Sequence, residues 1–199
     1  MKKISLVPIV NSFKNADTIT FKNNEKLFIL KDVFDLETLK SFHQLRHSKQ
    51  GTTVPLQENN ARISWDIDPL QNECFDTDDF SFFVEFLNTV QNRNHYQFCT
   101  ASVWEDSEGY QIGTHVDNST FVSAMQIYLP VFDENMEPKD SEQLYHTGTK
   151  FYQNEELVCQ VPFVPNTGYF LTNSQTVFHS SGDAVSADNV RRSLYMIFK

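Results

Sequence analysis

The chain has 199 residues, of which 40% are hydrophobic and 21% are charged. This length is typical of a single domain, and the composition is that of a globular protein rather than a disordered, collagen-like or coiled-coil chain. The formal net charge is −10, from 16 basic and 26 acidic residues. An acidic surface repels phosphate backbones and anionic lipids, so the sequence argues against nucleic acid or a membrane as a partner.

The cysteines and the N-terminal segment bear on the compartment. Cys74, Cys99 and Cys159 lie far apart and form no CxxC pair, which fits a reducing compartment rather than a disulfide scaffold. The first apolar run is short and is interrupted by Pro8, so it does not resemble a signal peptide. No apolar stretch approaches the about 20 residues that span a bilayer. We therefore expect a cytoplasmic protein.

The N-terminal part of the chain predicts a strand, a helix and a second strand. Leu27–Leu30 is a short apolar run typical of a strand. A helix is expected from the N-cap residue Asp35 to about Arg46, because apolar residues recur there on one stripe. The polar stretch Ser48–Asn60 predicts an exposed loop. The alternation of apolar and polar residues over 63–67 then predicts a half-buried strand.

A second helix is predicted from about Asp78 to Arg93, where apolar residues recur at helical spacing and acidic residues stand at the start. After Asn94 the pattern changes to strand-like segments separated by turn-prone residues. Five strands are expected: Tyr96–Trp104, Phe121–Val131, Glu156–Val164, Gly168–Thr172 and Ser193–Phe198.

This order of elements predicts the fold class. Helices followed by a run of strands are typical of a mainly β protein with supporting helices (α+β), built as a jelly-roll sandwich or barrel with the helices on one face. We interpret residues 1–199 as one domain. Residues 1–94 form its strand–helix support region and residues 95–199 its β core.

The segment around His115 carries the chemistry. His115 and Asp117 are two residues apart, so on a strand both side chains would project from the same face. An imidazole beside a carboxylate supplies two of the three ligands of a facial metal triad, a site that suits Fe(II). The third ligand would be His146 or His179, and we favour His179 because it follows an apolar strand. An ordinary ion pair between His115 and Asp117 is the alternative.

Two arginines interrupt the apolar C-terminal strand. A buried guanidinium needs a counter-anion, and Arg191 and Ser193 share one face of the predicted strand. Together they could grip a carboxylate through a forked charge-assisted pair and a hydroxyl hydrogen bond. The alternative is that the arginines end a loop in solvent, which is the expectation for Arg192.

The HxD pair, the distal histidine and the final RxS, in this order, resemble the 2-oxoglutarate- and Fe(II)-dependent oxygenases, in particular their prolyl-hydroxylase-like branch. The resemblance extends from about Tyr96 to Lys199 and is looser over Leu27–Arg46. It implies a double-stranded β-helix core of the jelly-roll or cupin-like type, with the N-terminal helices packed on one face.

The resemblance also implies roles for six residues. Three of them would ligate the iron and form the catalytic centre: His115, Asp117 and His179. Arg191, with Ser193 as helper, would bind the distal carboxylate of 2-oxoglutarate, and Tyr128 would hydrogen-bond the same cosubstrate. The doubled arginine leaves Arg191 or Arg192 open as the anion binder. The polar insert 133–150 would either cover the site or form a surface hairpin.

The implied reaction is hydroxylation of an unactivated C–H bond with O2, coupled to conversion of 2-oxoglutarate to succinate and CO2, with ascorbate as a candidate reductant. A prolyl residue of a protein or peptide is the first candidate substrate, and a free amino acid or small metabolite is the second. Trp104, Tyr110 and Phe178 are candidates for the substrate side, with core packing as the alternative role. Two other hypotheses stay open: a cupin-like metalloprotein that uses no 2-oxoglutarate, and a non-catalytic β-sandwich in which His115 and His179 never meet.

Overall fold

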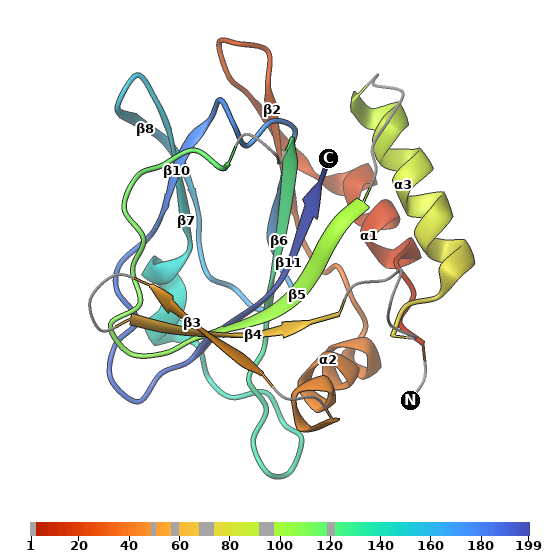
Figure 1. Cartoon of the computed structure of the whole chain (residues 1–199), viewed down its shortest axis with the longest axis vertical. Coiled ribbons are helices and arrows are strands. Elements are labelled where there is room, and N and C mark those ends of the chain that lie inside the picture. The colour runs from red at the N-terminus through yellow and green to blue at the C-terminus, as the bar shows by residue number, and fades with distance from the viewer. Residues whose placement is uncertain (1–2, 49–50, 57–59, 68–73, 92–97, 119–121) are drawn as a thin grey trace.

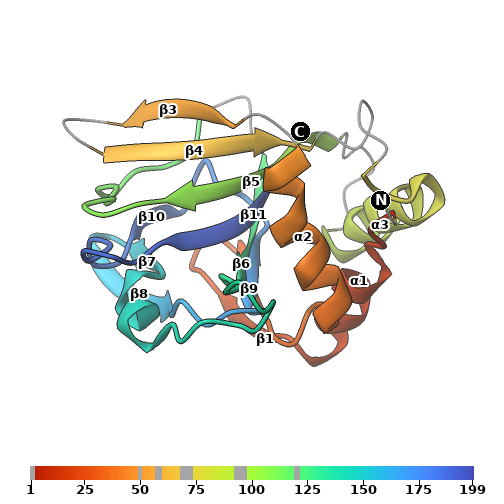
Figure 2. The ribbon, with the colours of Figure 1, turned by 90° about the horizontal axis from the view of Figure 1, so that it is seen from below.

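Two antiparallel β-sheets face each other, and helices cover the outer side of the larger sheet (Figures 1 and 2). The computed structural model describes all residues except 1–2, 49–50, 57–59, 68–73, 92–97 and 119–121. The large sheet has the strand order β1-β2-β9-β6-β11-β5-β4-β3, and the small sheet has the order β10-β7-β8. This is the predicted mainly β, jelly-roll architecture with supporting helices.

The bounds of the elements are as follows. The large sheet contains β1 (Asp17–Thr20), β2 (Lys26–Leu30), β3 (Thr52–Leu56), β4 (Asn60–Asp66), β5 (Phe98–Asp106), β6 (Ser123–Leu129), β9 (Gly168–Leu171) and β11 (Arg191–Phe198). The small sheet contains β7 (Thr149–Gln153), β8 (Glu156–Val161) and β10 (Phe178–Ser181). The helices are α1 (Val7–Ser12), α2 (Leu36–Ser48) and α3 (Thr77–Gln91), with the 3-10 turns η1 (Phe13–Asn15) and η2 (Glu142–Thr147).

Both long helices begin at an aspartate that caps their free N–H groups. Asp35 Oδ1 accepts a hydrogen bond from the backbone N–H of Thr38 at 2.8 Å, as its position in the sequence predicts. Asp76 Oδ1 accepts from the N–H groups of Asp78 and Asp79 at 3.0 and 3.2 Å. The two predicted helices are therefore confirmed. The predicted end of the second, at Arg93, lies outside the described residues.

The loop expected over Ser48–Asn60 is wrong in part. Thr52–Leu56 forms β3, which pairs with β4 in a register that sets Thr53 opposite Ile63. As the last strand of the sheet, β3 has only one neighbour and can carry a proline and polar residues, so its composition resembles a loop.

The strands predicted in the C-terminal half are present, with shifted ends. The expected starts at Tyr96 and Phe121 lie outside the described residues. Strand β11 begins at Arg191 rather than Ser193. Besides β3, the elements not predicted from the sequence are α1, η1, β1, η2, β7 and β10. None of the described helices has the length and apolar character of a transmembrane segment.

Alternate residues of β11 face two different environments. Leu194, Met196 and Phe198 belong to the core beneath the helices. Arg191 and Tyr195, on the other face, line a cavity between the two sheets. One face of the large sheet at β11 is therefore mainly apolar and covered by the helices, and the other face is polar and lines the site.

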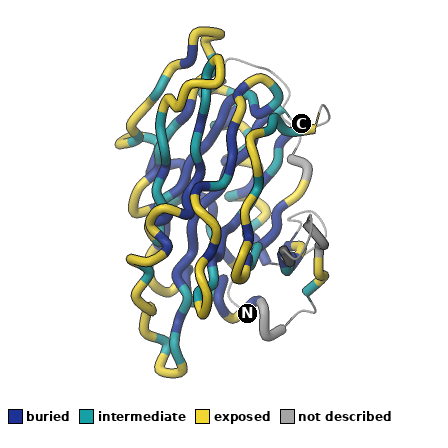
Figure 3. The backbone as a smooth tube through the Cα atoms, turned by 90° about the vertical axis from the view of Figure 1, so that its left-hand side faces the viewer, coloured by how far each residue is buried: buried dark blue, intermediate teal, exposed yellow. Residues whose placement is uncertain are grey.

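On the apolar side, phenylalanine rings pack against one another among aliphatic side chains. The Phe198 ring lies 5.9 Å from those of Phe83 on α3 and Phe170 on β9, both in edge-to-face geometry. All three side chains are fully buried, which is worth about 1.5–3 kcal/mol for each ring. In Figure 3 the buried residues are concentrated in the middle of the molecule, and many exposed residues lie in the loops at its edges. This core holds the large sheet rigid beneath the site.

Close approach of β9 to β6 provides a test of the sheet packing. A Cβ on Gly168 would lie 2.1 Å from the carbonyl oxygen of Gln126, whereas a Cβ on Gly113 would have no atom within 4 Å. We expect Gly168→Ala to lower the free energy of unfolding by about 3 kcal/mol, because one strand must move away from the other. Gly113→Ala should change it by less than about 1 kcal/mol. Urea unfolding of both variants measures the difference, and equal effects would contradict this packing.

Candidate metal centre

Backbone hydrogen bonds bring His115 and His179 together from distant parts of the sequence. The N–H of His115 donates to the carbonyl of His179 at 2.9 Å, and the N–H of His179 donates to the carbonyl of His115 at 2.8 Å. The N–H of Asp117 donates to the carbonyl of Ser174 at 2.9 Å. His179 lies on β10, whereas His115 and Asp117 lie on the irregular segment that follows β5. The expected strand through His115 is thus reduced to a single bridge.

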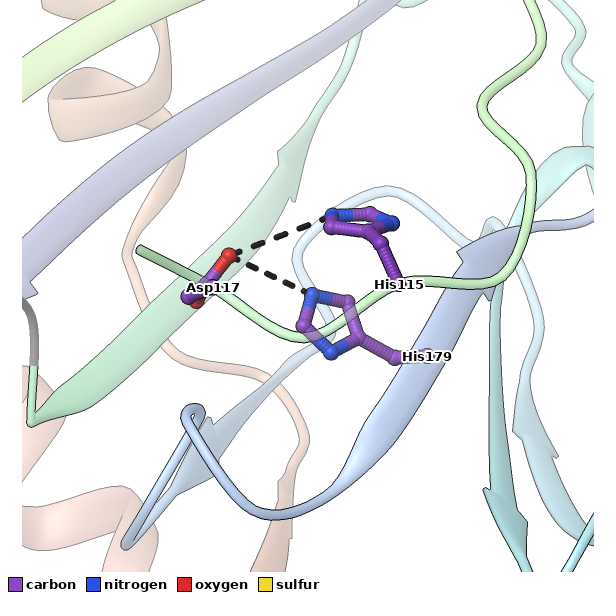
Figure 4. Close-up of side chains that lie close together, drawn as sticks. All are labelled: His115, Asp117 and His179. Atoms are coloured by element: carbon purple, nitrogen blue, oxygen red, sulfur yellow. Dashed lines mark ion pairs between the residues drawn. The ribbon is translucent and has the colours of Figure 1, made fainter. Parts of the chain in front are cut away.

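The three side chains converge on one point, as Figure 4 shows. Asp117 Oδ1 lies 3.5 Å from Nε2 of His179 and 3.9 Å from Nε2 of His115. The potential ligand atoms all lie within 4.8 Å of one another. Donors that share one ion at about 2.1 Å stand roughly 3–4 Å apart, so these groups can hold a common metal after small adjustments.

Both imidazoles are oriented by a hydrogen bond from their other nitrogen. Nδ1–H of His115 donates to the carbonyl of Gly113 at 2.9 Å, and Nδ1–H of His179 donates to that of Val177 at 3.1 Å. This contact orients each ring so that Nε2 is the nitrogen that faces Asp117. A metal ion would take the place of the proton on Nε2 when it binds.

The Asp117 carboxylate is held in its ionised form. Burial raises the pKa of Asp117, but the hydrogen bond and charge of His179, helped by Ser174 and His115, outweigh it and lower the pKa below its usual value. The hydroxyl of Tyr195 lies 3.5 Å from Oδ2 of Asp117 and donates toward it. Two imidazoles and one ionised carboxylate, with open positions, form a donor set that suits Fe(II).

The third ligand candidate, His146, lies away from this group. It stands on η2, where its carbonyl accepts a hydrogen bond from Gln160 at 3.0 Å. Among the described residues, only His115, Asp117 and His179 form a cluster with the geometry of a metal site. The side chain of His115 is 39% exposed, against 12% for Asp117 and 10% for His179. The site is therefore open to solvent on the His115 side.

A cavity of about 110 Å³ adjoins the triad and is also lined by Arg191. This is small beside the about 300–1,000 Å³ of typical ligand pockets, so it suits a small molecule rather than a peptide. Its polar lining comes from both sheets. The residues that line it, besides the triad and Arg191, include Arg62, Trp104, Tyr110, Gln126, Thr149 and Tyr169.

Only one of the two adjacent arginines faces this cavity. Arg191 is 3% exposed, and its Nε and Nη2 donate to Oδ2 of Asp106 at 3.1 and 2.9 Å. Arg192 points to the helix side, where its Nε donates to Glu105 at 2.7 Å and its Nη1 to Nδ1 of His43 at 3.0 Å. Of the two candidate anion binders, Arg191 is therefore the one that lines the cavity. The expectation that Arg192 lies in solvent is wrong, since α2 buries it.

Ser193 and Tyr128 are one layer removed from the cavity wall. Oγ of Ser193 accepts a hydrogen bond from Nε2 of Gln126 at 2.9 Å. The hydroxyl of Tyr128 lies 2.9 Å from Oγ1 of Thr149 and accepts the Thr149 backbone N–H at the same distance. Gln126 and Thr149 are the residues that line the cavity. In this structure the two predicted binding residues therefore hold other polar groups in place.

The 133–150 insert is neither a simple lid nor only a surface hairpin. Its outer part is closed by a bridge between Phe132 and Pro138. Its inner end forms η2 and the start of β7, where the carbonyl of Thr147 accepts a hydrogen bond from Nη1 of Arg191 and Thr149 lines the cavity. The end of the insert is thus part of the site wall.

Sequence reasoning missed several residues of the site, among them Arg62, Asp106 and Tyr195. Sheet register sets Arg62, Asp106 and Arg191 directly opposite one another on β4, β5 and β11. No local motif marks Arg62 or Asp106, because their proximity to Arg191 depends on the pairing of β5 with β11, which is distant in the sequence. The alternation along β11 that put Arg191 and Ser193 on one face could have identified Tyr195.

Comparisons with known proteins identify the fold. No protein-family model and no curated protein matches the sequence. Among solved structures, a 2OG-Fe(II) oxygenase family oxidoreductase from Burkholderia pseudomallei matches with a TM-score of 0.62 at 14% identity, over 87% of this chain and 84% of that one. A prolyl hydroxylase from Trichoplax adhaerens, in complex with a hypoxia inducible factor peptide fragment, matches with a TM-score of 0.61 at 14% identity, over 96% and 88%.

A third match has a different described reaction. SnoN, a non-heme α-ketoglutarate-dependent epimerase from nogalamycin biosynthesis, has a TM-score of 0.59 at 10% identity, over 98% of this chain and 82% of that one. The chain therefore has the fold of the 2OG-Fe(II) oxygenases, and the resemblance seen in the sequence is confirmed at this level. Because this one fold serves both hydroxylation and epimerisation, the reaction must be argued from the site.

Metal binding by the triad can be tested with Mn(II) as an air-stable substitute for Fe(II). We expect His179→Ala and Asp117→Ala each to weaken Mn(II) binding at least about 100-fold, because each removes one of three ligands. His146→Ala is the matched control and should bind as the wild type does. Isothermal titration calorimetry measures all three affinities. Equal binding by the His179 and His146 variants would contradict the proposed ligand set.

Proposed function

We propose that this protein is a 2-oxoglutarate- and Fe(II)-dependent oxygenase, with Fe(II) held by His115, Asp117 and His179. The observation that carries the proposal is that one small cavity is lined both by this triad and by the buried Arg191. A small dicarboxylate needs both features at once, a metal for its keto-acid end and a cation for its far end. The similarity of fold to 2OG-Fe(II) oxygenases supports the same conclusion.

Bound iron and 2-oxoglutarate would supply the oxidising chemistry, with O2 as oxidant and succinate and CO2 as products. The residues of the chain would position the cosubstrate and the metal ligands. Arg191 lies deep in the cavity and would fix the far carboxylate, which sets the direction of the diacid toward the triad. Gln126, Thr149 and Tyr169 line the cavity with hydrogen-bonding groups. Tyr195 would hold the Asp117 carboxylate in place through its 3.5 Å contact.

The primary substrate must reach the metal from outside the small cavity. His115, the most exposed ligand, marks the open side. A larger cavity of about 780 Å³ borders the same chain segments, lined by Thr114 and Phe178, the neighbours of His115 and His179. Phe178 is 50% exposed, so of the three aromatic candidates it is the one available to a large partner. Trp104 and Tyr110 instead line the small cavity.

Hydroxylation of a prolyl residue in a protein or peptide is the reaction that we propose first. The prolyl hydroxylase with a bound peptide fragment shares the fold over most of both chains, which supports this choice. A free amino acid or another small metabolite is the alternative substrate. The structural match to an α-ketoglutarate-dependent epimerase makes epimerisation an alternative reaction. We retain a cytoplasmic location and ascorbate as reductant as parts of the proposal.

A second candidate function is a cupin-like metalloprotein that uses no 2-oxoglutarate. The observation that favours it is that Arg191 already has a carboxylate partner in Asp106, so its charge is balanced within the protein. Under that hypothesis Arg191 is a structural residue, and replacing it would leave the chemistry at the metal unchanged.

Spectroscopy separates the two functions. We expect 2-oxoglutarate added without oxygen to the Fe(II)-loaded protein to produce a weak visible charge-transfer band, because its keto acid would chelate the iron. Arg191→Met should raise the concentration of 2-oxoglutarate needed for this band about 10–100-fold, since a charge-assisted pair is lost. The control is Arg192→Met on the opposite face. A missing band despite bound iron would rule out the cosubstrate.

The substrate class can be tested by succinate release in air. Peptides that contain proline, free amino acids and small metabolites are supplied in turn with Fe(II), 2-oxoglutarate and ascorbate. We expect a true substrate to stimulate succinate formation well above the uncoupled level, and prolyl peptides to do so first. Stimulation by free amino acids alone would contradict the prolyl assignment and leave the oxygenase assignment intact.

A further inference from the structure

Arg191 does not stand alone in the cavity wall. The carboxylate of Asp106 is completely buried and is shared between two guanidinium groups. Nε of Arg62 donates to Oδ1 of Asp106 at 2.6 Å and its Nη2 to Oδ2 at 3.2 Å, while Arg191 donates to Oδ2 at 2.9 and 3.1 Å. All three side chains are less than one-tenth exposed.

The net charge of Arg62, Asp106 and Arg191 determines whether this group of side chains attracts an anion. A pair of Arg191 and Asp106 is neutral and offers no net attraction to an anion. With Arg62 included, the group carries one uncompensated positive charge. An unpaired charge in a buried site is energetically unfavourable. Tyr110, which contacts Arg62, does not cancel this charge. Burial and the nearby Asp106 raise the pKa of its phenol to about 12, so it stays neutral.

Arg62 is also held in a fixed position relative to the metal site. Its guanidinium carbon lies 3.6 Å from the centre of the Trp104 ring, a cation–π contact. The Trp104 ring stacks on Tyr195 with centroids 3.9 Å apart, and the Tyr195 hydroxyl reaches Asp117 at 3.5 Å. A continuous line of packed groups thus connects Arg62 with a ligand of the candidate metal centre, and both line the same cavity.

From these contacts we infer that Arg62 is a specificity-determining residue that selects a dicarboxylate cosubstrate. Because Asp106 neutralises one arginine, the second provides the net charge that the far carboxylate of 2-oxoglutarate neutralises on binding. The two arginines and Asp106 form one anion anchor, in which Arg62 and Arg191 both face the ligand. This inference rests on the proposed function, since it assumes a keto diacid bound at the triad.

Affinities for two keto acids test the inference. One is 2-oxoglutarate, and the other is 2-oxopentanoate, which has the same five carbons but no far carboxylate. Both are titrated calorimetrically into the Mn(II)-loaded protein. We expect Arg62→Met to weaken binding of 2-oxoglutarate about 10–100-fold and to leave binding of 2-oxopentanoate unchanged within about threefold. Arg62→Lys, which keeps the charge but not the planar fork, should recover part of the loss.

A double variant separates charge from structural support. Arg62→Met alone leaves a neutral pair, whereas Arg62→Met with Asp106→Asn leaves Arg191 with its full charge and an amide oxygen to accept its hydrogen bond. We expect the double variant to recover the preference for 2-oxoglutarate. If Arg62 only supported Asp106 and Arg191, the double variant would bind no better than the single one, and the inference would be overturned. The double variant also removes the buried Asp106 carboxylate, which has lost one of its two arginine partners in Arg62→Met, so it serves if the single variant fails to fold.

The wild-type titration distinguishes this inference from the proposed function. Mn(II)-loaded wild type that binds neither keto acid would overturn both. Wild type that prefers 2-oxoglutarate, with a preference equally strong in Arg62→Met, would overturn only the role of Arg62. Equal weakening of both keto acids in Arg62→Met would also overturn it, because the effect would not involve the far carboxylate.

Discussion

The site depends on a two-way backbone bridge between residues 115 and 179. Each of these histidines donates its N–H to the carbonyl of the other, which joins an irregular segment to strand β10 of the small sheet. Without this bridge, Asp117 would face only one imidazole. The hydrogen bonds from Nδ1 to local carbonyls then set the ring orientation, so that Nε2 of both histidines faces Asp117. Ligand side chains that are oriented by other contacts hold a metal more firmly.

The large sheet provides the other half of the cavity wall. The register of its strands determines which charged side chains meet there. Strands β4, β5 and β11 set Arg62, Asp106 and Arg191 abreast, so three charged groups meet although they come from distant parts of the chain. Apart from the ion pair of Arg192 with Glu105, the opposite face of the same strands is apolar and packs against the helices. Guanidinium groups can stand within the otherwise apolar strand β11 because each has a carboxylate partner on its own face of the sheet. The helix-side core fixes the strands, and the fixed strands position the charges.

Local patterns in the sequence were enough for the fold class, the two long helices, and the choice of His179 over His146 as partner of His115 and Asp117. They failed where a residue's role depends on its neighbour across a sheet. Strand β3 resembles a loop because an edge strand need not be apolar. Arg192 was expected in solvent because nothing in the sequence shows that α2 and Glu105 cover it. Arg62 and Asp106 carry no motif, and only the strand order brings them to Arg191.

The central claim is that one cavity holds a metal at one end and a small diacid anchored by buried arginines at the other. A crystal structure obtained without oxygen, with Fe(II) and 2-oxoglutarate, tests it most directly. The account predicts a metal about 2.0–2.3 Å from Nε2 of both histidines and from the Asp117 carboxylate. The far carboxylate of the diacid should contact Arg191 and Arg62. A metal bound by other residues, or a diacid bound outside this cavity, would contradict the account.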